Sequence, residues 1–175
     1  TIQGQTTAGN VKLPAGCVVQ TVSAEKTDTA SSTTTVPTFS DAGLSCTITP
    51  KFSTSKILVH VNAGLGIDTS VFNTMRVVRN VGGGSFSIIS AADSAGSRTA
   101  AHACVYDENN EGMVYMQDFI HLDNPATTSA VIYKVQLANS GGGGAVYLNR
   151  SGRDNNTAAY DVRTSSRIVL QEIAQ

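Results

Sequence analysis

The segment Lys56-Ile57-Leu58-Val59-His60-Val61-Asn62-Ala63 decides the fold class of this chain. Its apolar residues recur at every second position, as in an extended strand with one buried face. One face carries Ile57, Val59, Val61 and Ala63, and the other carries Leu58, His60 and Asn62. We therefore expect an antiparallel strand whose first set of side chains lies in a core.

The same alternation extends outward along the chain. In Ala130–Ala138, the residues Val131, Tyr133, Val135 and Leu137 alternate with Ile132, Lys134 and Gln136. The apolar runs, separated by turns rich in Gly, Asp and Asn, are Cys17–Ser23, Thr33–Phe39, Leu44–Ile48, Lys56–Leu65, Thr74–Arg79, Ser85–Ser90, Ala100–Tyr106, Gly112–Leu122, Ala130–Ala138, Ala145–Asn149 and Arg167–Ile173. Runs at this spacing predict an all-β fold, an antiparallel two-sheet β-sandwich that is jelly-roll-like and has about 8–11 strands.

The composition agrees with this prediction. The chain has 175 residues, of which 14% are charged, and it contains 20 Thr and 18 Ser. Average domains are about 25% charged. Thr is β-branched and Ser competes with helical hydrogen bonds, so the composition argues against a helical bundle. We expect residues 1–16 to form an extended N-terminal lead-in or attachment segment, and residues 17–175 to form a single β-sandwich domain.

The charge pattern excludes two classes of partner. The chain has 12 Lys and Arg against 13 Asp and Glu, a formal net charge of −1, and its basic residues are scattered. Nucleic-acid binders show a basic stripe, so we expect no nucleic-acid partner. No stretch approaches the ~20 consecutive apolar residues of a membrane span, so we expect a soluble protein without membrane insertion.

Cysteine and histidine spacing predicts no metal site and no cofactor. Cys17, Cys46 and Cys104 form an odd set, which we interpret as small buried residues, with a Cys17–Cys46 disulfide as the alternative. No Cys-x-x-Cys pair is present to support a zinc site. His102 and Cys104 lie two positions apart and so share one side of a strand, but two ligands do not make a site.

The sequence contains no pattern typical of catalysis. Asp107 and Glu111 can face each other across a loop, as glycosidase carboxylates do across a cleft, but a solvated turn has the same composition. The tracts Gly82–Gly84 and Gly141–Gly144 lack the Lys-Ser/Thr of a phosphate-binding loop and fit hairpin tips. We therefore predict a protein that is not an enzyme.

The last apolar run predicts a subunit contact. Ile168, Leu170 and Glu172 share one face of Arg167–Ile173, and Val169, Gln171 and Ile173 share the other. Apolar side chains thus point both ways. In an antiparallel domain the second apolar face needs a cover, and we expect a neighbouring subunit to contact Val169, Gln171 and Ile173.

Several strand-and-turn motifs resemble those of virion structural proteins from tailed phages, particularly marine and cyanobacterial phages, described as tail-fibre or head-fibre proteins. The matching segments are Leu13–Gln20, Gly43–Pro50 running into Ser53–Val59, Leu122–Ser129 before Tyr133–Gln136, Leu148–Ser151, and Ser165–Ala174. The resemblance covers nearly the whole chain from Leu13 onward, and none of its motifs is catalytic.

The resemblance implies a C-terminal fibre or knob domain located in the virion, with other virion proteins and a host surface glycan as partners. We expect a homotrimer, because phage fibres and many jelly rolls are threefold. Loops at one end of the sandwich would contact the host. The candidate recognition residues are Gly83, Asp107, Glu108, Asn109, Asn110, Glu111 and Gly142.

Two alternatives remain open at this point. In the first, the chain is a capsid decoration protein that binds the shell through its N-terminal segment. In the second, it is a carbohydrate-acting depolymerase whose carboxylates are Asp107 and Glu111.

Overall fold

The computed structural model describes residues 13–67, 71–93, 95–106, 111–141, 143–156 and 159–175. In this part of the chain every regular element is a strand. The bounds are β1 Val18–Lys26, β2 Ala30–Ser32, β3 Ser40–Ile48, β4 Lys56–Ile67, β5 Asn73–Val81, β6 Ser87–Ile88, β7 Ala103–Val105, β8 Val114–Asp123, β9 Val131–Asn139, β10 Val146–Leu148 and β11 Ser166–Ile173. No helix among the described residues is long and apolar enough to cross a membrane.

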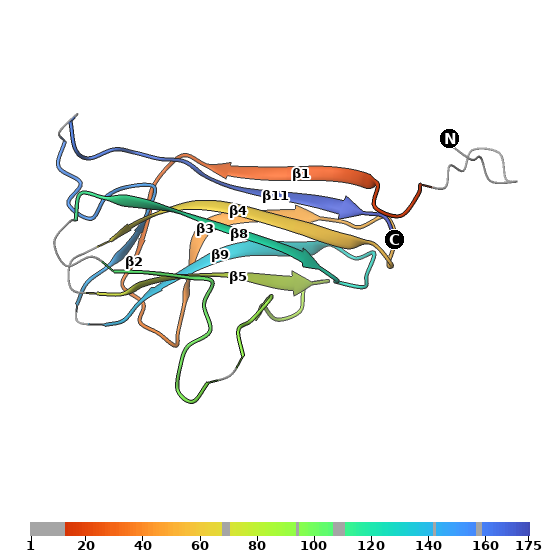
Figure 1. Ribbon diagram of the computed structural model, residues 1–175, viewed down its shortest axis with the longest axis horizontal. Helices are drawn as coiled ribbons and strands as arrows, with labels where there is room; N and C mark the ends of the chain where they lie inside the picture. The colour runs from red at the N-terminus through yellow and green to blue at the C-terminus, as the bar shows by residue number, and fades with distance from the viewer. Residues whose placement is uncertain (1–12, 68–70, 94, 107–110, 142, 157–158) are drawn as a thin grey trace, which may run out of the picture.

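The strands form two antiparallel sheets that pack face to face (Figure 1). In the six-stranded sheet, β4 lies between β8 on one side and β11 and β10, placed end to end, on the other. β1 continues the sheet from β11, and β2 continues it from β10. In the five-stranded sheet, β9 lies between β3 and β5, and the far side of β5 pairs with β7 and then with β6.

The order of pairing identifies the sandwich as a jelly roll. The early strands β1, β3, β4 and β5 pair with the late strands β11, β9, β8 and β7, respectively. A long hairpin that is rolled up so that its successive pairs alternate between two sheets gives this arrangement. The predicted all-β, two-sheet sandwich is therefore confirmed.

Alternation along the strands explains the core. Ile57, Val59, Val61 and Ala63 of β4 are all fully buried, as are Val131, Tyr133 and Val135 of β9, with Leu137 nearly so. These side chains face one another between the sheets with Leu44, Ile48, Met75, Val77, Ile168 and Leu170. Both sets of core residues predicted from the period of two are confirmed, because burying one face of each sheet is what the alternation allows.

One predicted strand is misplaced. The run Thr33–Phe39 is not a strand, and the nearby strand is β2 at Ala30–Ser32. Pro37 has no backbone N–H to give to a ladder, and the amide of Thr38 donates to the carbonyl of Thr35 at 3.0 Å, which makes a turn. The runs Ser85–Ser90 and Ala100–Tyr106 are also much shorter as strands, at β6 and β7.

The cysteine prediction is correct for only part of the set. All three thiols are free. Cys46 is buried, Cys17 is partly buried and Cys104 is exposed, so the interpretation as buried residues is wrong for Cys104. β7 is a short strand at the border of its sheet, where Cys104 stays accessible to solvent.

The sandwich has two distinct ends (Figure 1). At the end that we call the terminal end, the amide of Gly16 donates to the carbonyl of Ala174 at 2.8 Å, beside the β3–β4 turn and the β5–β6 turn. At the opposite, distal end lie the starts of β5 and β8, the β9–β10 connection and the β10–β11 loop.

Candidate interaction surface

The outer face of the six-stranded sheet exposes several large apolar side chains among polar ones. Cross-strand neighbours on this face are Leu58 and Leu122, His60 and Ile120, and Gly64 and Met116. Ile120 is 64% exposed, Leu122 45% and Met116 44%. Leu58 is partly buried, and it lies next to Gln171 on its other side.

The predicted interface residues lie on the same face. Val169, Gln171 and Ile173 of β11 point outward and are partly buried, whereas Ile168, Leu170 and Glu172 point inward and are buried. We call the apolar residues of this face the outer strip, defined as Leu58, Met116, Ile120, Leu122, Val169 and Ile173.

Sequence reasoning missed the contribution of β8 to this face. Within the run Gly112–Leu122, Phe119 pairs with Val61 and so faces the core, whereas Ile120 faces solvent. The signal was present, because this run, like Arg167–Ile173, has apolar residues on both faces.

β8 is also an edge strand of this sheet in the described part of the chain. It has 10 residues, and β4 is its only strand neighbour in the described part of the chain. Natural edge strands are protected by Lys, Pro or a bulge. β8 contains neither Lys nor Pro, and its register with β4 runs without a shift from Val114 to Asp123.

The outer face of the five-stranded sheet has the opposite character. Lys134 of β9 donates to Asp41 of β3 at 2.6 Å, and Gln136 donates to the same carboxylate at 2.7 Å. Arg76 of β5 donates to Gln136 at 2.9 Å and also stacks on Phe39. These bonds lower the pKa of Asp41, against the opposing effect of its partial burial. Charged and amide groups that satisfy one another form a face suited to water.

A polar band crosses the outer face of the six-stranded sheet and separates Met116 from the other residues of the outer strip. Arg167 lies 3.4 Å from Glu25, and His60 lies 3.7 Å from Asp118, which also accepts a bond from Asn62 at 2.6 Å. These exposed pairs contribute little to stability. They do interrupt the apolar surface between Ile120 and Met116.

The candidate recognition loops do not meet at one end. Gly83 lies in the β5–β6 turn at the terminal end, where the amide of Gly82 donates to the carbonyl of Ala130 at 2.9 Å. Glu111 lies at the distal end, where its carbonyl accepts from the amide of Arg153 at 3.1 Å. The prediction that these loops share one end is therefore wrong for Gly83, because β5 runs the length of the sandwich between them. Asp107, Glu108, Asn109, Asn110 and Gly142 lie outside the described residues.

The distal end carries an exposed aromatic pair. The rings of Phe72 and Tyr106 stack with centroids 4.4 Å apart, and the two residues are 49% and 39% exposed. Ser140 fixes this position, because its hydroxyl accepts from the amide of Phe72 at 3.0 Å while its amide donates to the Phe72 carbonyl at 2.9 Å.

The β10–β11 loop at this end is rich in ion pairs. Asp154 contacts Arg150 at 3.1 Å and Arg163 at 2.8 Å. Asp161 contacts Arg153 at 3.0 Å and accepts from the Ser151 hydroxyl at 3.1 Å. Both carboxylates of this loop are thus paired with arginine.

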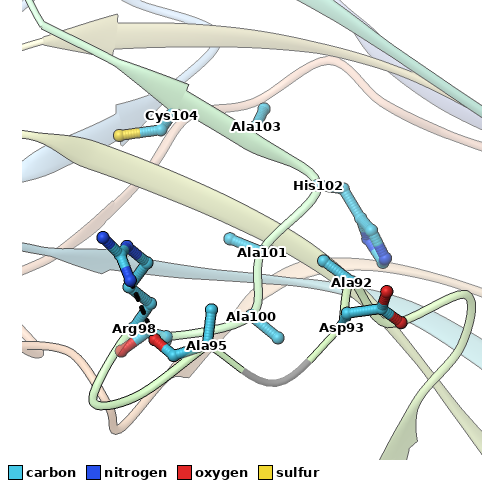
Figure 2. Close-up of a pocket in the computed structure, with 10 residues that line it drawn as sticks. Ala92, Asp93, Ala95, Arg98, Ala100, Ala101, His102, Ala103 and Cys104 are labelled. Carbon is cyan, nitrogen blue, oxygen red and sulfur yellow. Dashed lines mark hydrogen bonds between the residues drawn. The ribbon is translucent and has the colours of Figure 1, made fainter.

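The β6–β7 connection lines a cavity of about 310 Å³ (Figure 2). Its lining includes Asp93, Arg98, His102 and Cys104 among several alanines. His102 and Cys104 point away from each other in Figure 2. Burial raises the pKa of the Cys104 thiol, which keeps it protonated and weakly nucleophilic. Among the described residues no three His, Cys, Asp or Glu side chains group as metal ligands.

The buried ionisable groups bind one another or the backbone. Asp123 accepts from Arg79 at 2.7 and 2.6 Å and from the Tyr133 hydroxyl at 2.6 Å. Burial, together with the bond to Asp123, raises the pKa of Tyr133. Glu172, fully buried, accepts from the amides of Lys51 and Phe52 at 2.8 and 3.1 Å. These groups connect strands and turns inside the sandwich.

No protein-family model and no curated protein matches this chain. Among solved structures, it is similar to one of infectious bursal disease virus, Gt strain, with 12% identity and a TM-score of 0.47 over 100% of this chain and 42% of that chain. The Gx strain structure has 11% identity and a TM-score of 0.43 over 99% and 46%, respectively. The VP2 subviral particle of the same virus has 11% identity and a TM-score of 0.41 over 98% and 45%.

The chain spans less than half the length of these solved structures. At such identities and TM-scores, the likeness does not establish a shared function.

Proposed function

We propose that this chain is a non-enzymatic structural module of a virus particle, and that copies of it associate through the outer strip. The observation that supports the proposal is the contrast between the two outer faces of the sandwich. One is covered by charged groups that bind one another, and the other exposes Met116, Ile120 and Leu122 along an edge strand that has no Lys, Pro or bulge. Exposed apolar patches of this kind mark protein contacts.

A second copy of the chain is the occupant that the charges favour. The formal net charge of −1 leaves copies with little mutual repulsion. The polar band offers Asp118 of β8 and Arg167 of β11, exposed side chains of opposite charge on the same face. When β8 of one copy approaches β11 of the next, these charges are complementary. A head-to-tail contact forms a ring when its rotation closes, and a homotrimer is the ring that we propose.

Jelly rolls build viral capsids but also form lectins and cupins, so the fold alone does not choose among these functions. The phage-like motifs of the sequence and the apolar outer strip together favour a location in the virion, with other virion proteins as further partners.

Light scattering on the purified chain at micromolar concentration tests the association. We expect a mass of three copies for the unchanged chain and of one copy for Ile120→Asp, because a carboxylate would be buried in the contact. Thr47→Asp places the same charge on the exposed outer side of β3 and should leave the trimer intact. A monomeric unchanged chain, or a trimeric Ile120→Asp, would contradict the proposal.

A second candidate function is contact with the host surface at the distal end. The exposed Phe72–Tyr106 stack favours it, because sugar rings pack on flat aromatic faces and this end lies opposite the chain termini. Binding to host cells should fall with Phe72→Ala and persist with Phe52→Ala, since Phe52 is equally exposed, at 49%, in the β3–β4 turn at the other end. Equal binding by both variants would remove this candidate.

The two remaining alternatives make different predictions. A decoration protein would lose incorporation into particles when residues 1–10 are deleted. A depolymerase would cleave host polysaccharide and lose that activity with Asp107→Asn or Glu111→Gln.

A further inference from the structure

β5 lacks a strand neighbour at one point along its outer edge. β7 pairs with Asn73–Met75 of β5, and β6 pairs with Val78 and Arg79. Val77 lies in the interval between the two partners. Without another donor or acceptor, the backbone of Val77 would be left unpaired in a largely buried place.

The His102 side chain fills this interval. The amide of Val77 donates to His102 Nδ1 at 2.9 Å, and His102 Nε2 lies 2.8 Å from the carbonyl oxygen of Ile89. Because Nδ1 accepts a hydrogen bond, it carries no proton, and the neutral ring therefore has its proton on Nε2, which donates to Ile89. The imidazole thus replaces a peptide group in the ladder.

Among the described residues of the intervening segment, 90–93 and 95–101, few other bonds reach the sandwich. At its borders the amide of Ile89 donates to the carbonyl of Val77 at 3.3 Å, and the amide of His102 donates to the carbonyl of Met75 at 2.8 Å. Within it, the backbone and guanidinium of Arg98 both bond to the carbonyl of Ala95, which is inside the segment itself. Most of its described residues are exposed.

The ring packs beside an aromatic side chain, and its cationic and titratable neighbours oppose a positive charge on it. The Phe119 ring lies 4.2 Å from the imidazole. Arg76 of β5 and His121 of β8 are the cationic and titratable neighbours, and both oppose protonation of His102. Asp93 lines the same cavity, but no described carboxylate forms an ion pair with His102.

We propose that His102, bonded to Val77 and Ile89, is an acid-sensitive latch that holds the segment from Ile89 to His102 on the edge of β5. When the ring takes up a second proton, Nδ1–H faces the N–H of Val77 and two donors oppose each other. The ring must then leave the interval, and the bond to Ile89 breaks with it. The segment opens while the two sheets stay together.

The direction of the pH dependence follows from the environment of the ring. Burial lowers the pKa of His102 below its ordinary value of 6.5, while bonds to the backbone at Ile89 and Ser90 act the other way. The closed state therefore binds the proton less well than the open state. The latch is at full strength above pH 6.5 and weakens as the pH falls through the lowered pKa.

Two NMR measurements on the unchanged chain test the latch. At about pH 8, ¹⁵N shifts of the imidazole should show the proton on Nε2. Hydrogen exchange of the Val77 and Ile89 amides, corrected for intrinsic rates, should then show protection that falls about tenfold for each pH unit between the open and closed pKa values. A proton on Nδ1, or Val77 protection that does not change down to about pH 5, would overturn the proposal.

Variants separate the latch from a merely structural role. In His102→Gln, the amide can accept from Val77 and donate to Ile89 without titrating, so protection should persist and lose its pH dependence. His60→Gln removes an exposed histidine of β4 and should leave the pH dependence of Val77 unchanged. Retention of the pH dependence in His102→Gln would assign it to another group and overturn the proposal.

Discussion

Two central strands of the sandwich, β4 and β5, each have a gap in strand pairing along one edge, and different side chains make the backbone hydrogen bonds there. Each has two partners placed end to end along one edge, β11 and β10 on β4 and β7 and β6 on β5, with an interval between them. In the β4 interval, the amide of Gly64 donates to the Ser166 hydroxyl at 3.0 Å, and its carbonyl accepts from the amide of Asn149 at 2.9 Å. In the β5 interval, the imidazole of His102 makes the bonds.

The two solutions differ in their chemistry and in their burial. The Asn149 side chain donates to the carbonyls of Lys26 and Asp28 at 2.7 and 2.9 Å and accepts from Ser166 at 2.5 Å. Asn149 and Ser166 are fully buried, and neither titrates. His102 is partly buried and titrates. The side chain that fills such an interval therefore decides whether the bonds at the edge of a strand depend on pH.

The largest effect is expected at Gly66, beside the β4 interval. A Cβ at this position would lie 1.8 Å from the carbonyl oxygen of Arg150, because the β10–β11 loop crosses β4 there. Gly66→Ala should destabilise the fold by about 4 kcal/mol, measured by urea denaturation. Gly83 is the control, since it has a φ of +83° and open space around it. Gly83→Ala should cost only about 1 kcal/mol from backbone strain.

Asn149→Ala should cost about 3 kcal/mol in the same measurement. It leaves the buried Ser166 hydroxyl and two carbonyls without their partner. It also puts alanine at a φ of +63°, which asparagine tolerates better. Asn155→Ala, at an exposed site, should stay within about 0.5 kcal/mol of the unchanged chain. If Asn149→Ala and Asn155→Ala lowered the free energy of unfolding by similar amounts, the β4 interval would not depend on the Asn149 side chain.

His102→Ala should cost about 2 kcal/mol at about pH 8, less than Asn149→Ala, because the freed Val77 and Ile89 groups lie nearer to water. The difference from the unchanged chain should shrink toward pH 5 or so, where the ring no longer bonds. A cost that is independent of pH would mean that packing on Phe119, and not the hydrogen bonds, is what the ring contributes.

The smallest expected effect, at the Gly64 amide, best distinguishes local opening at β5 from loosening of the whole sandwich. Exchange protection of the Gly64 amide should change by less than about twofold between about pH 8 and pH 5, since its partners do not titrate. A fall that matches the fall at Val77 would mean that the sandwich loosens as a whole, and the contrast between the intervals would then be lost.

The sequence predicted what depends on local alternation. The segment Lys56–Ala63 and the run Ala130–Ala138 could be assigned to core strands because burial of one face imposes a period of two. The outward position of Val169, Gln171 and Ile173 follows from the same rule. Whether these three residues contact a subunit stays a prediction.

Features that depend on distant contacts could not be predicted. The role of His102 requires Val77, which lies 25 positions away in the sequence. In the sequence, Gly66 looks like an ordinary strand residue. Only the structure shows that the backbone of Arg150 crosses it. The glycine tracts look alike in sequence, yet Gly83 and Gly141 lie at opposite ends, because the direction of each strand is set by its pairing. Turn composition carries no information about which end of a sandwich a turn occupies.

The meeting of the first and last strands at the terminal end has a practical consequence. The amide of Gly16 bonds to Ala174, and the amide of Ala174 bonds back to Cys17 at 2.9 Å. Because Gly16 and Ala174 lie side by side, the module can be inserted into a surface loop of another protein without distorting that protein's fold. For the same reason, a short linker from residue 175 to residue 13 should allow circular permutation, with new termini in an exposed turn such as Gly82–Gly84.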